Sequence, residues 1–237
     1  MHAIPLFLAA LAGYLAGAIS FSRMITRLVD PKADLTSVEI PVEGLDETYK
    51  MTAMGASTAG MLLGRRVGCL IGLLDMLKVT IPTLVIRWLY PDQPYFLVTA
   101  LAGMLGHIWP VYYRFKGGRG ISAVYGGLFA IDWLGAIATS GLGMALGMVV
   151  FRDLLVSYLS GLWLLIPWMW FRTHNGYYLA YALLANLIFL LGMLPELRQI
   201  MRLRRKRGGK GSMMSMMEHT PMGQSMLDIA RRLKLMK

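Results

Sequence analysis

The stretch VGCLIGLLDMLKVTIPTLVIRWLY, residues 67–90, is long and apolar and contains only three charged side chains. About 20 consecutive, mostly apolar residues are needed for a helix to cross the hydrocarbon core of a bilayer. Residues 67–90 are therefore predicted to form a transmembrane helix, and the protein is expected to be integral to a membrane.

Apolar stretches of similar length recur along the chain and extend this prediction to a bundle. Clear candidates for further spans are residues 3–25, 95–113, 154–171 and 176–195. Residues 121–151 are long for one helix and are interrupted by Asp132, so we predict a short helix (121–131) and a fuller one (134–151). The expected fold class is all-α, a polytopic membrane helix bundle of about seven transmembrane segments.

The composition supports this class and excludes several others. Apolar residues make up 56% of the 237 residues and charged residues 16%, with a mean hydropathy of +0.54. A soluble domain has about 25% charged residues. An ordinary soluble enzyme, a disordered chain and a disulfide scaffold are thereby excluded. The single cysteine, Cys69, is expected to be small and buried, and it offers no thiolate metal cluster.

The basic charge is concentrated at the C-terminal end. The formal net charge is +11, and residues 196–237 carry 11 Lys and Arg against 3 Asp and Glu. This location argues against nucleic-acid binding and predicts a membrane domain, residues 1–196, followed by a basic, Met-rich cytoplasmic tail, residues 197–237. From Ser225 the tail has the pattern of a short basic amphipathic helix, which we expect to lie on membrane lipid headgroups.

The distribution of Lys and Arg between the spans predicts which loops face the cytoplasm. Basic residues follow the first and third predicted spans and precede the second, whereas the connection 90–95 has no Lys or Arg. By the positive-inside rule the basic loops are cytoplasmic and residues 90–95 are external. Seven segments then place the N-terminus outside and the C-terminus in the cytoplasm.

Residues 30–50 differ from the rest of the chain because they are acidic and show almost no helical apolar period. The segment contains six Asp and Glu side chains and two Lys side chains. Two interpretations stay open: a solvated cytoplasmic loop, or a lid or partner-binding insert.

The densest signal for chemistry is GHIWPVYYRFKGGRG, residues 106–120, at the cytoplasmic end of a predicted span. Its glycines let a ligand approach the backbone, and its two final cations with unblocked N–H groups form an anion-binding nest. The nest comprises Lys116, Gly117, Gly118, Arg119 and Gly120. A helix beginning near Ile121 would add its positive end, so phosphate is the natural ligand. A glycine-rich loop that merely obeys the positive-inside rule is the alternative.

Ionisable residues inside predicted spans are costly, and they usually face one another or a cavity. Lys78 follows Asp75 by three residues, so the two side chains can share a helical face. They form either a self-compensating ion pair or a site in which Asp75 holds Lys78 for an anion. His107 could serve as a general base, but its apolar surroundings favour a structural role.

The run from Gly106 to Ala123 resembles the bacterial acylphosphate-dependent glycerol-3-phosphate acyltransferases, whose pattern there is close to GHxFPVFLxFKGGKGVAT. LGRRVG (63–68) followed by LDMLK (74–78) resembles the family's LGKKxG and LDxxKG elements at the same spacing. Residues 157–160 resemble its SLxS element, and Asn186 and Glu196 resemble parts of its C-terminal motif. The resemblance spans roughly residues 13–196.

This resemblance implies a location and a reaction. Family members are seven-helix proteins of the bacterial inner membrane that move a fatty acyl group from acyl phosphate to glycerol-3-phosphate, giving lysophosphatidic acid for phospholipid synthesis. The glycerol hydroxyl would attack the acyl carbonyl, while cations and N–H groups stabilise the departing phosphate. No metal or cofactor is expected.

The resemblance also implies roles for particular residues. Lys78 and Ser157 would be the catalytic residues, and they would contact glycerol-3-phosphate together with Asn186. Contacts to acyl phosphate would come from Ser57, Thr58 and the glycines near them, Gly55 among them. The loop from Lys116 to Gly120 is also expected to bind substrate. His107 and Asp75 are expected to be structural.

The sequence departs from the family at the phosphate loop. In the family a GSGNIGATN loop and a following arginine hold the phosphates, and only residues 55–58 resemble its GATN half. The preceding positions fall on Lys50, Met51, Thr52 and Ala53, the arginine on Met61, and a C-terminal histidine on Leu183. Lys50, Arg65 and Arg66 are candidates to substitute. These losses support an alternative function, a non-catalytic scaffold or subunit of a membrane complex that keeps the fold.

Overall fold

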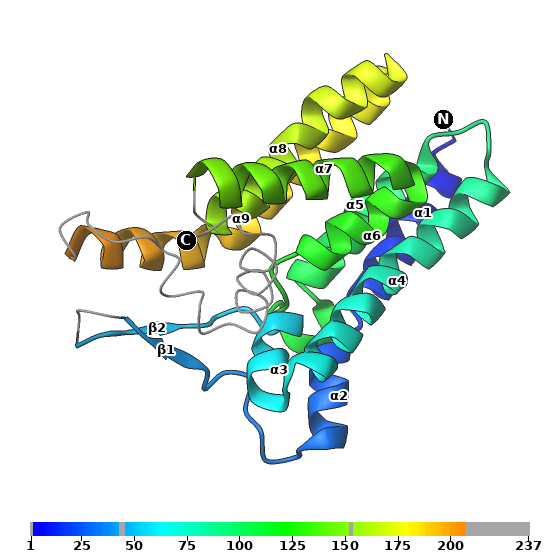
Figure 1. The fold of residues 1–237 in the computed structure, drawn as a ribbon. Helices are drawn as coiled ribbons and strands as arrows, with labels where there is room; N and C mark the ends of the chain where they lie inside the picture. Colours follow the sequence, from blue (N-terminus) through cyan, green and yellow to red (C-terminus); the bar gives the residue numbers. More distant parts are fainter. Residues whose placement is uncertain (1, 43–45, 152–153, 207–237) are drawn as a thin grey trace.

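Helices make up most of the structure (Figure 1), a computed structural model that describes residues 2–42, 46–151 and 154–206. The α-helices are α1 (Ala3–Gly17), α2 (Phe21–Val29), α3 (Ala56–Leu63), α4 (Arg65–Leu89), α5 (Tyr95–Ile108), α6 (Ile121–Ile131), α7 (Trp133–Ala145), α8 (Leu154–Thr173) and α9 (Gly176–Lys206). A 3-10 turn, Val111–Tyr113, follows α5, and a π-helical segment, Leu146–Phe151, follows α7. Two short strands, β1 (Glu39–Pro41) and β2 (Thr48–Lys50), lie between α2 and α3.

Four segments of the described chain are long and apolar enough to cross a membrane. They are Ala3–Val29, Arg65–Leu89, Tyr95–Tyr113 and Gly176–Leu203. Each matches a span expected from the sequence. Helices α6 and α7 are apolar but shorter, because the 11 residues of α6 extend only about 16 Å. The chain is therefore a polytopic membrane helix bundle, while the count of seven spans stays a prediction.

Contacts between distant residues define two opposite ends of the bundle. At one end the His2 N–H donates to the Tyr95 hydroxyl at 2.9 Å, so the N-terminus lies beside the connection 90–95. At the other end Arg119 Nε donates to Glu196 Oε2 at 2.7 Å, which joins the loop before α6 to α9. The long helices run between these two ends (Figure 1).

Helices α1 and α5 pack with their backbones in close contact. A Cβ on Gly13 would lie 2.2 Å from the Thr99 carbonyl oxygen, and one on Gly17 would lie 2.0 Å from that of Gly103. Larger side chains at Gly13 and Gly17 would separate the two helices. This packing aligns α5, and with it the glycine-rich loop that follows it.

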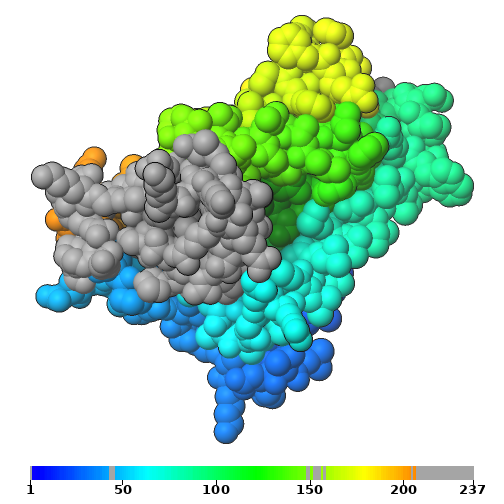
Figure 2. Space-filling view, viewed as in Figure 1, coloured from blue at the N-terminus to red at the C-terminus, as the bar shows by residue number. Residues whose placement is uncertain are grey.

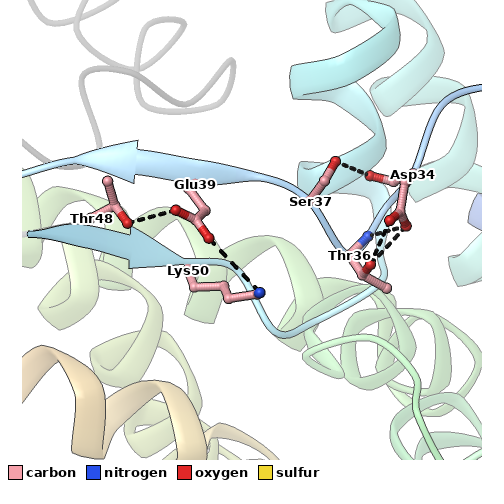
Figure 3. Close-up of polar contacts among 6 residues, drawn as sticks. All are labelled: Asp34, Thr36, Ser37, Glu39, Thr48 and Lys50. Carbon is pink, nitrogen blue, oxygen red and sulfur yellow. Dashed lines mark hydrogen bonds and ion pairs between the residues drawn. The ribbon is translucent and has the colours of Figure 1, made fainter.

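The acidic segment 30–50 contains a β-hairpin in addition to loop. Glu39 lies opposite Lys50 in an antiparallel register. Thr48 donates to Glu39 at 2.7 Å, and the Lys50 ammonium lies 3.8 Å from the Glu39 carboxylate (Figure 3). Before β1, the N–H and the hydroxyl of Thr36 each donate to Asp34 Oδ1 at 2.8 Å. Hydrogen bonds from Thr36 hold the pKa of the Asp34 carboxyl below its ordinary value.

One face of the hairpin is apolar and packs against α9. The buried cluster consists of Val38, Ile40, Val42, Tyr49, Met51, Ile200 and Leu203. Along the hairpin these residues alternate with exposed ones, which is the period of a half-buried strand. The segment has almost no helical apolar period, and the expectation from the sequence is therefore a loop without strands. The bundle is therefore helical apart from this one hairpin in the described residues.

Helix α9 continues across residue 196, where the sequence analysis divides the membrane domain from the tail. It runs from Gly176 to Lys206, and Lys206 forms an ion pair with Glu47 of the hairpin segment. Residues 207–237, with the predicted amphipathic helix from Ser225, lie outside the described part of the chain.

Candidate active site

The glycine-rich loop folds back against the end of α5. The Gly118 N–H donates to the His107 carbonyl at 3.0 Å, and the Gly117 carbonyl accepts from the Met54 N–H at 2.9 Å. A Cβ on Gly117 would lie 2.1 Å from the His107 carbonyl oxygen, and one on Gly118 would lie 2.2 Å from His107 Nε2. Neither position accepts a side chain without a shift of its neighbours. The close packing of the loop on His107 therefore requires glycine at both positions of the pair in KGGRG.

A cavity of about 380 Å³ lies between this loop, α3 and α4. Seven residues to which the motifs and the family resemblance give a binding or structural role line it: Gly55, Ser57, Thr58, Asp75, His107, Arg119 and Gly120. The rest of the wall consists of Ala53, Ala56, Gly60, Arg65, Gly68, Cys69, Gly72, Ile121 and Ser122. Three motifs that are far apart in the sequence thus meet at one cavity.

Two helix N-termini lie at the cavity wall. Helix α3 begins after Gly55 and α6 begins after Gly120, and the first-turn residues of both helices line the cavity. The N-cap residue of both helices is a glycine, which has no side chain to cap the first N–H groups. The first N–H groups of a helix lack intrahelical acceptors and carry partial positive charge. The cavity is therefore suited to an anion such as phosphate.

Arg119 reaches the cavity with its guanidinium held by a buried carboxylate. Its Nε donates to Glu196 Oε2 at 2.7 Å, and the Glu196 side chain is only 4% exposed. Thr52 donates to the other carboxylate oxygen at 3.5 Å. Burial, followed by the nearby charge of Glu196, raises the pKa of the Tyr49 phenol, which stays neutral beside this pair. The charge-assisted bond to Glu196 fixes the orientation of Arg119 at the wall.

Asp75 and Lys78 form an ion pair one turn apart on α4. Lys78 Nζ lies 2.7 Å from Asp75 Oδ1 and also donates to the Ile19 carbonyl at 2.5 Å. His107 Nδ1 lies 3.8 Å from the same Asp75 oxygen. Asp75 and His107 line the cavity, while Lys78 stands behind Asp75. The two charges compensate each other, and the carboxylate of the pair lines the cavity. A contact of Lys78 with substrate stays a prediction.

Lys116 and Asn186, which are also expected in the site, are not among the residues that line the cavity. Lys116 is exposed, and its carbonyl accepts from Arg23 at 2.8 Å. Asn186 Nδ2 donates to the Leu162 carbonyl at 2.9 Å, between α9 and α8. Ser157 belongs to α8, but its side chain is outside the described part of the structure. Their contacts to substrate stay predictions.

Arg65 and Cys69, on the first turns of α4, line the cavity as well. Cys69 is exposed, so the expectation of a buried cysteine is wrong, because this side of α4 faces outward beside the cavity. Among the three candidate substitutes for lost phosphate contacts, Arg65 reaches the cavity, whereas Lys50 pairs with Glu39 on the hairpin. In the sequence, the pattern that could have indicated this cavity-lining face of α4 is the run of small residues at helical spacing between Arg65 and Asp75.

The chemical character of the cavity is that of a phosphate site at a membrane surface. It combines uncapped helix N-termini, two arginines and a wall of small residues. Within residues 2–42, 46–151 and 154–206, no three His, Cys, Asp or Glu side chains gather as ligands for a metal ion. The fold and the cavity together define a polytopic membrane protein with a cavity suited to phosphate-bearing molecules.

Comparison with known proteins gives the family. The family model described as glycerol-3-phosphate acyltransferase matches residues 7–206, and the chain belongs to this family. The glycerol-3-phosphate acyltransferase 1 of Bacillus cereus is 34% identical over 136 residues, which cover 57% of this chain and 68% of the relative. The glycerol-3-phosphate acyltransferase of Halalkalibacterium halodurans is 29% identical over 195 residues, covering 79% of this chain and 86% of the relative.

Solved structures agree with this assignment. The chain is similar to PlsY (YgiH), an integral membrane glycerol 3-phosphate acyltransferase, in its glycerol 3-phosphate form. The TM-score is 0.69 at 25% identity, over 84% of this chain and 93% of the other. The lysophosphatidic acid form of PlsY gives a TM-score of 0.70 at 22% identity with the same coverage, a likeness of fold. The chain is thus a multi-pass membrane protein whose bacterial relatives indicate the inner membrane.

Proposed function

We propose that the protein transfers a fatty acyl group from acyl phosphate to glycerol-3-phosphate and produces lysophosphatidic acid. The single observation that carries this proposal is the cavity at which Arg119 and the N-termini of α3 and α6 meet. Both substrates carry a phosphate, and both would reach a cavity at the end of a membrane helix bundle. Family membership supplies the reaction, and the cavity supplies a place for it.

The reaction joins the two substrates without a covalent enzyme intermediate. A glycerol hydroxyl attacks the acyl carbonyl, the bond between the carbonyl carbon and the phosphate oxygen breaks, and the phosphate leaves with the electron pair. The hydroxyl proton passes to the released phosphate, so the products are lysophosphatidic acid and inorganic phosphate. An acyl phosphate is an activated anhydride, so binding, orientation and stabilisation of the leaving group supply the catalysis.

Each part of the cavity has a role in this scheme. The uncapped N–H groups of α3 and α6 and the Arg119 guanidinium stabilise the negative charge that develops on the departing phosphate. Glu196 keeps Arg119 oriented for that contact. The ion pair of Asp75 and Lys78 fixes the position of α4 behind the reacting groups.

The test is an assay of the purified protein with palmitoyl phosphate and glycerol-3-phosphate, which follows both lysophosphatidic acid and released phosphate. We expect turnover in the wild type and a loss of at least about 100-fold in kcat/KM for Arg119→Ala, the effect of removing one transition-state donor. Arg119→Lys should lose less. Equal product formation by wild type, Arg119→Ala and a protein-free control would overturn the proposal.

One observation favours a second candidate, a non-catalytic subunit of a membrane complex. Met61 and Leu183 occupy positions where the family pattern has charged or polar residues, and Met61 packs against the apolar hairpin cluster. A protein that is inactive in the assay yet copurifies from native membranes with other integral subunits in fixed stoichiometry would support this candidate. Turnover that depends on Arg119 would exclude it.

A further inference from the structure

We infer that Arg65 is the second phosphate-binding cation of the cavity, in addition to Arg119. The inference rests on the proposed function, because a reaction between two phosphate-bearing substrates brings two phosphates to one place. Arg119 serves the phosphate held between the N-termini of α3 and α6. Arg65 serves the phosphate of the other substrate.

The charges at the cavity wall point to this role. Among the described residues that line the cavity, Arg65 and Arg119 are the two arginines and Asp75 is the one carboxylate. Asp75 is neutralised by Lys78 at 2.7 Å, and it therefore adds no net negative charge to the cavity. The two arginines line the cavity from separate elements, the start of α4 and the loop before α6.

The position of Arg65 is fixed by the start of α4. Gly64 precedes it with a φ of 93°, a backbone conformation that favours glycine and turns the chain sharply from α3 into α4. Below Arg65 the face of α4 that lines the cavity continues through Gly68, Gly72 and Asp75. Arg65 and Asp75 are ten residues apart in α4, which corresponds to about 15 Å along the helix axis. Arg65 therefore stands at one end of the cavity wall formed by α4, and Asp75 stands at the other.

The end of α3 cannot supply this charge. Met61 lies on the last turn of α3 and packs with the apolar cluster of the hairpin and α9, where a charged side chain would lose its hydration. Because it packs against the hairpin, this part of α3 forms an apolar contact. A cation for the second phosphate has to come from a neighbouring element, and α4 places one there. Helix α3 packs against α4, and Figure 2 shows this cyan part of the chain on one face of the molecule.

The chain provides a matched control for Arg65. Arg66 is the next residue, carries the same charge at the same helix start and is also exposed, but it does not line the cavity. Both arginines contribute equally to the positive charge at the membrane surface. A difference between their alanine variants therefore reports on the cavity rather than on general electrostatics.

The first experiment measures KM for palmitoyl phosphate and for glycerol-3-phosphate separately in Arg65→Ala, Arg65→Lys and Arg66→Ala. We expect Arg65→Ala to raise KM for one of the two substrates by about tenfold, the effect of losing a charge-assisted phosphate contact. Arg65→Lys should recover part of this loss, and Arg66→Ala should stay within about twofold of wild type. The substrate whose KM rises is the one whose phosphate Arg65 binds. Equal effects of Arg65→Ala and Arg66→Ala would overturn the inference.

A second experiment does not depend on turnover. Cys69 is the one cysteine of the sequence, it is exposed, and it lines the cavity one turn from Arg65. The rate of its alkylation by a maleimide should fall when glycerol-3-phosphate or inorganic phosphate is added. In Arg65→Ala this protection should require about tenfold more ligand, and in Arg66→Ala it should not change.

The two experiments separate the inference from the proposed function. If the wild type has no acyltransferase activity but phosphate protects Cys69 through Arg65, the proposed function fails and the phosphate site stands. If the wild type is active but protection and both KM values are unaffected by Arg65→Ala, the inference about Arg65 fails alone.

Discussion

Asp75 and Lys78 show what one buried pair contributes to this protein. Their side chains are 3% and 4% exposed, so each charge depends on the other for stabilisation. Removing one partner of a buried ion pair typically costs about 3–5 kcal/mol, because the remaining charge is left uncompensated. We therefore expect Lys78→Met to lower the stability of the protein by that amount, measured by unfolding in detergent. Activity should fall in parallel, since Asp75 lines the cavity.

The double variant Asp75→Asn/Lys78→Met tests the explanation. With both charges removed, most of the lost stability should return, although the Ile19 carbonyl still loses its donor. If the double variant is as unstable as the single one, the loss comes from packing around Lys78 and not from an uncompensated carboxylate.

A second prediction concerns the packing of Gly118. A Cβ at this position would lie 2.2 Å from His107 Nε2, whereas one at Gly141 of α7 would meet nothing within 4 Å. Overpacking of this kind costs about 1–3 kcal/mol, while Gly to Ala in an open helical position stabilises by about 0.5–1 kcal/mol. Gly118→Ala should thus lower the midpoint of thermal unfolding, and Gly141→Ala should leave it equal or higher. Identical midpoints for the two variants would contradict the packing argument.

The residues of the site differ in how far the sequence alone could predict them. The loop 116–120 and the pair Asp75 and Lys78 could be predicted, because their signals are local spacings. The contact between Arg119 and Glu196 could not, since 77 residues separate them and only the packing of α9 brings them together. The same holds for Arg65, whose role depends on which face of α4 meets α3.

At the scale of elements, the docking of the hairpin on α9 is open to a direct test. Leu203 is buried in the hairpin cluster, whereas Met201 on the same helix is 53% exposed. A buried Leu to Ala change costs about 2–5 kcal/mol. We expect Leu203→Ala to loosen the hairpin, seen as faster amide hydrogen exchange at Ile40 and Tyr49, and Met201→Ala to leave the exchange unchanged. Because β2 leads directly into the loop 51–55 at the cavity, KM should also rise in Leu203→Ala alone.

The ion pair of Glu47 and Lys206 adds a pH dependence to the same contact. The hydrogen bond from Lys206 holds the pKa of the Glu47 carboxyl below its ordinary value of 4.5. A lowered pKa in the folded state means that the stabilisation is present above pH 4.5 and is lost as the pH falls through the folded value. The difference in stability between wild type and Glu47→Gln should therefore be constant near neutral pH and shrink below pH 4.5. A difference that grows in acid would contradict this sign.

Hydropathy predicts the long helices of the fold and does not predict the hairpin. Long apolar runs predict α1, α4, α5 and α9, since a bilayer imposes both length and composition. The hairpin follows another rule, alternation over a few residues, and its apolar face is explained only by the extension of α9 that covers it. The helix that covers the hairpin, α9, lies about 150 residues further along the chain, so the local sequence pattern of the hairpin does not indicate it.

At the scale of the whole molecule, the two ends of the bundle predict the topology. The contact of His2 with Tyr95 places the N-terminus at the end where residues 90–95 lie. The contact of Arg119 with Glu196 places the C-terminal part of α9 at the opposite end, with the cavity. The chain therefore starts at one end and leaves α9 at the other, which requires an odd number of passes between them. Seven passes satisfy this condition.

Charge then decides which end faces the cytoplasm. The cavity end carries the exposed basic residues of the loops around α3, α4 and α5, whereas the connection 90–95 has none, so the cavity end is expected inside. In a Cys69→Ser background, a cysteine introduced by Asp92→Cys should react with a membrane-impermeant maleimide in intact cells. One introduced by Arg198→Cys should react only after permeabilisation, since both positions are exposed but lie at opposite ends. The reverse pattern would place the cavity outside, away from cytoplasmic acyl phosphate and glycerol-3-phosphate, and the proposed reaction would then lack its substrates.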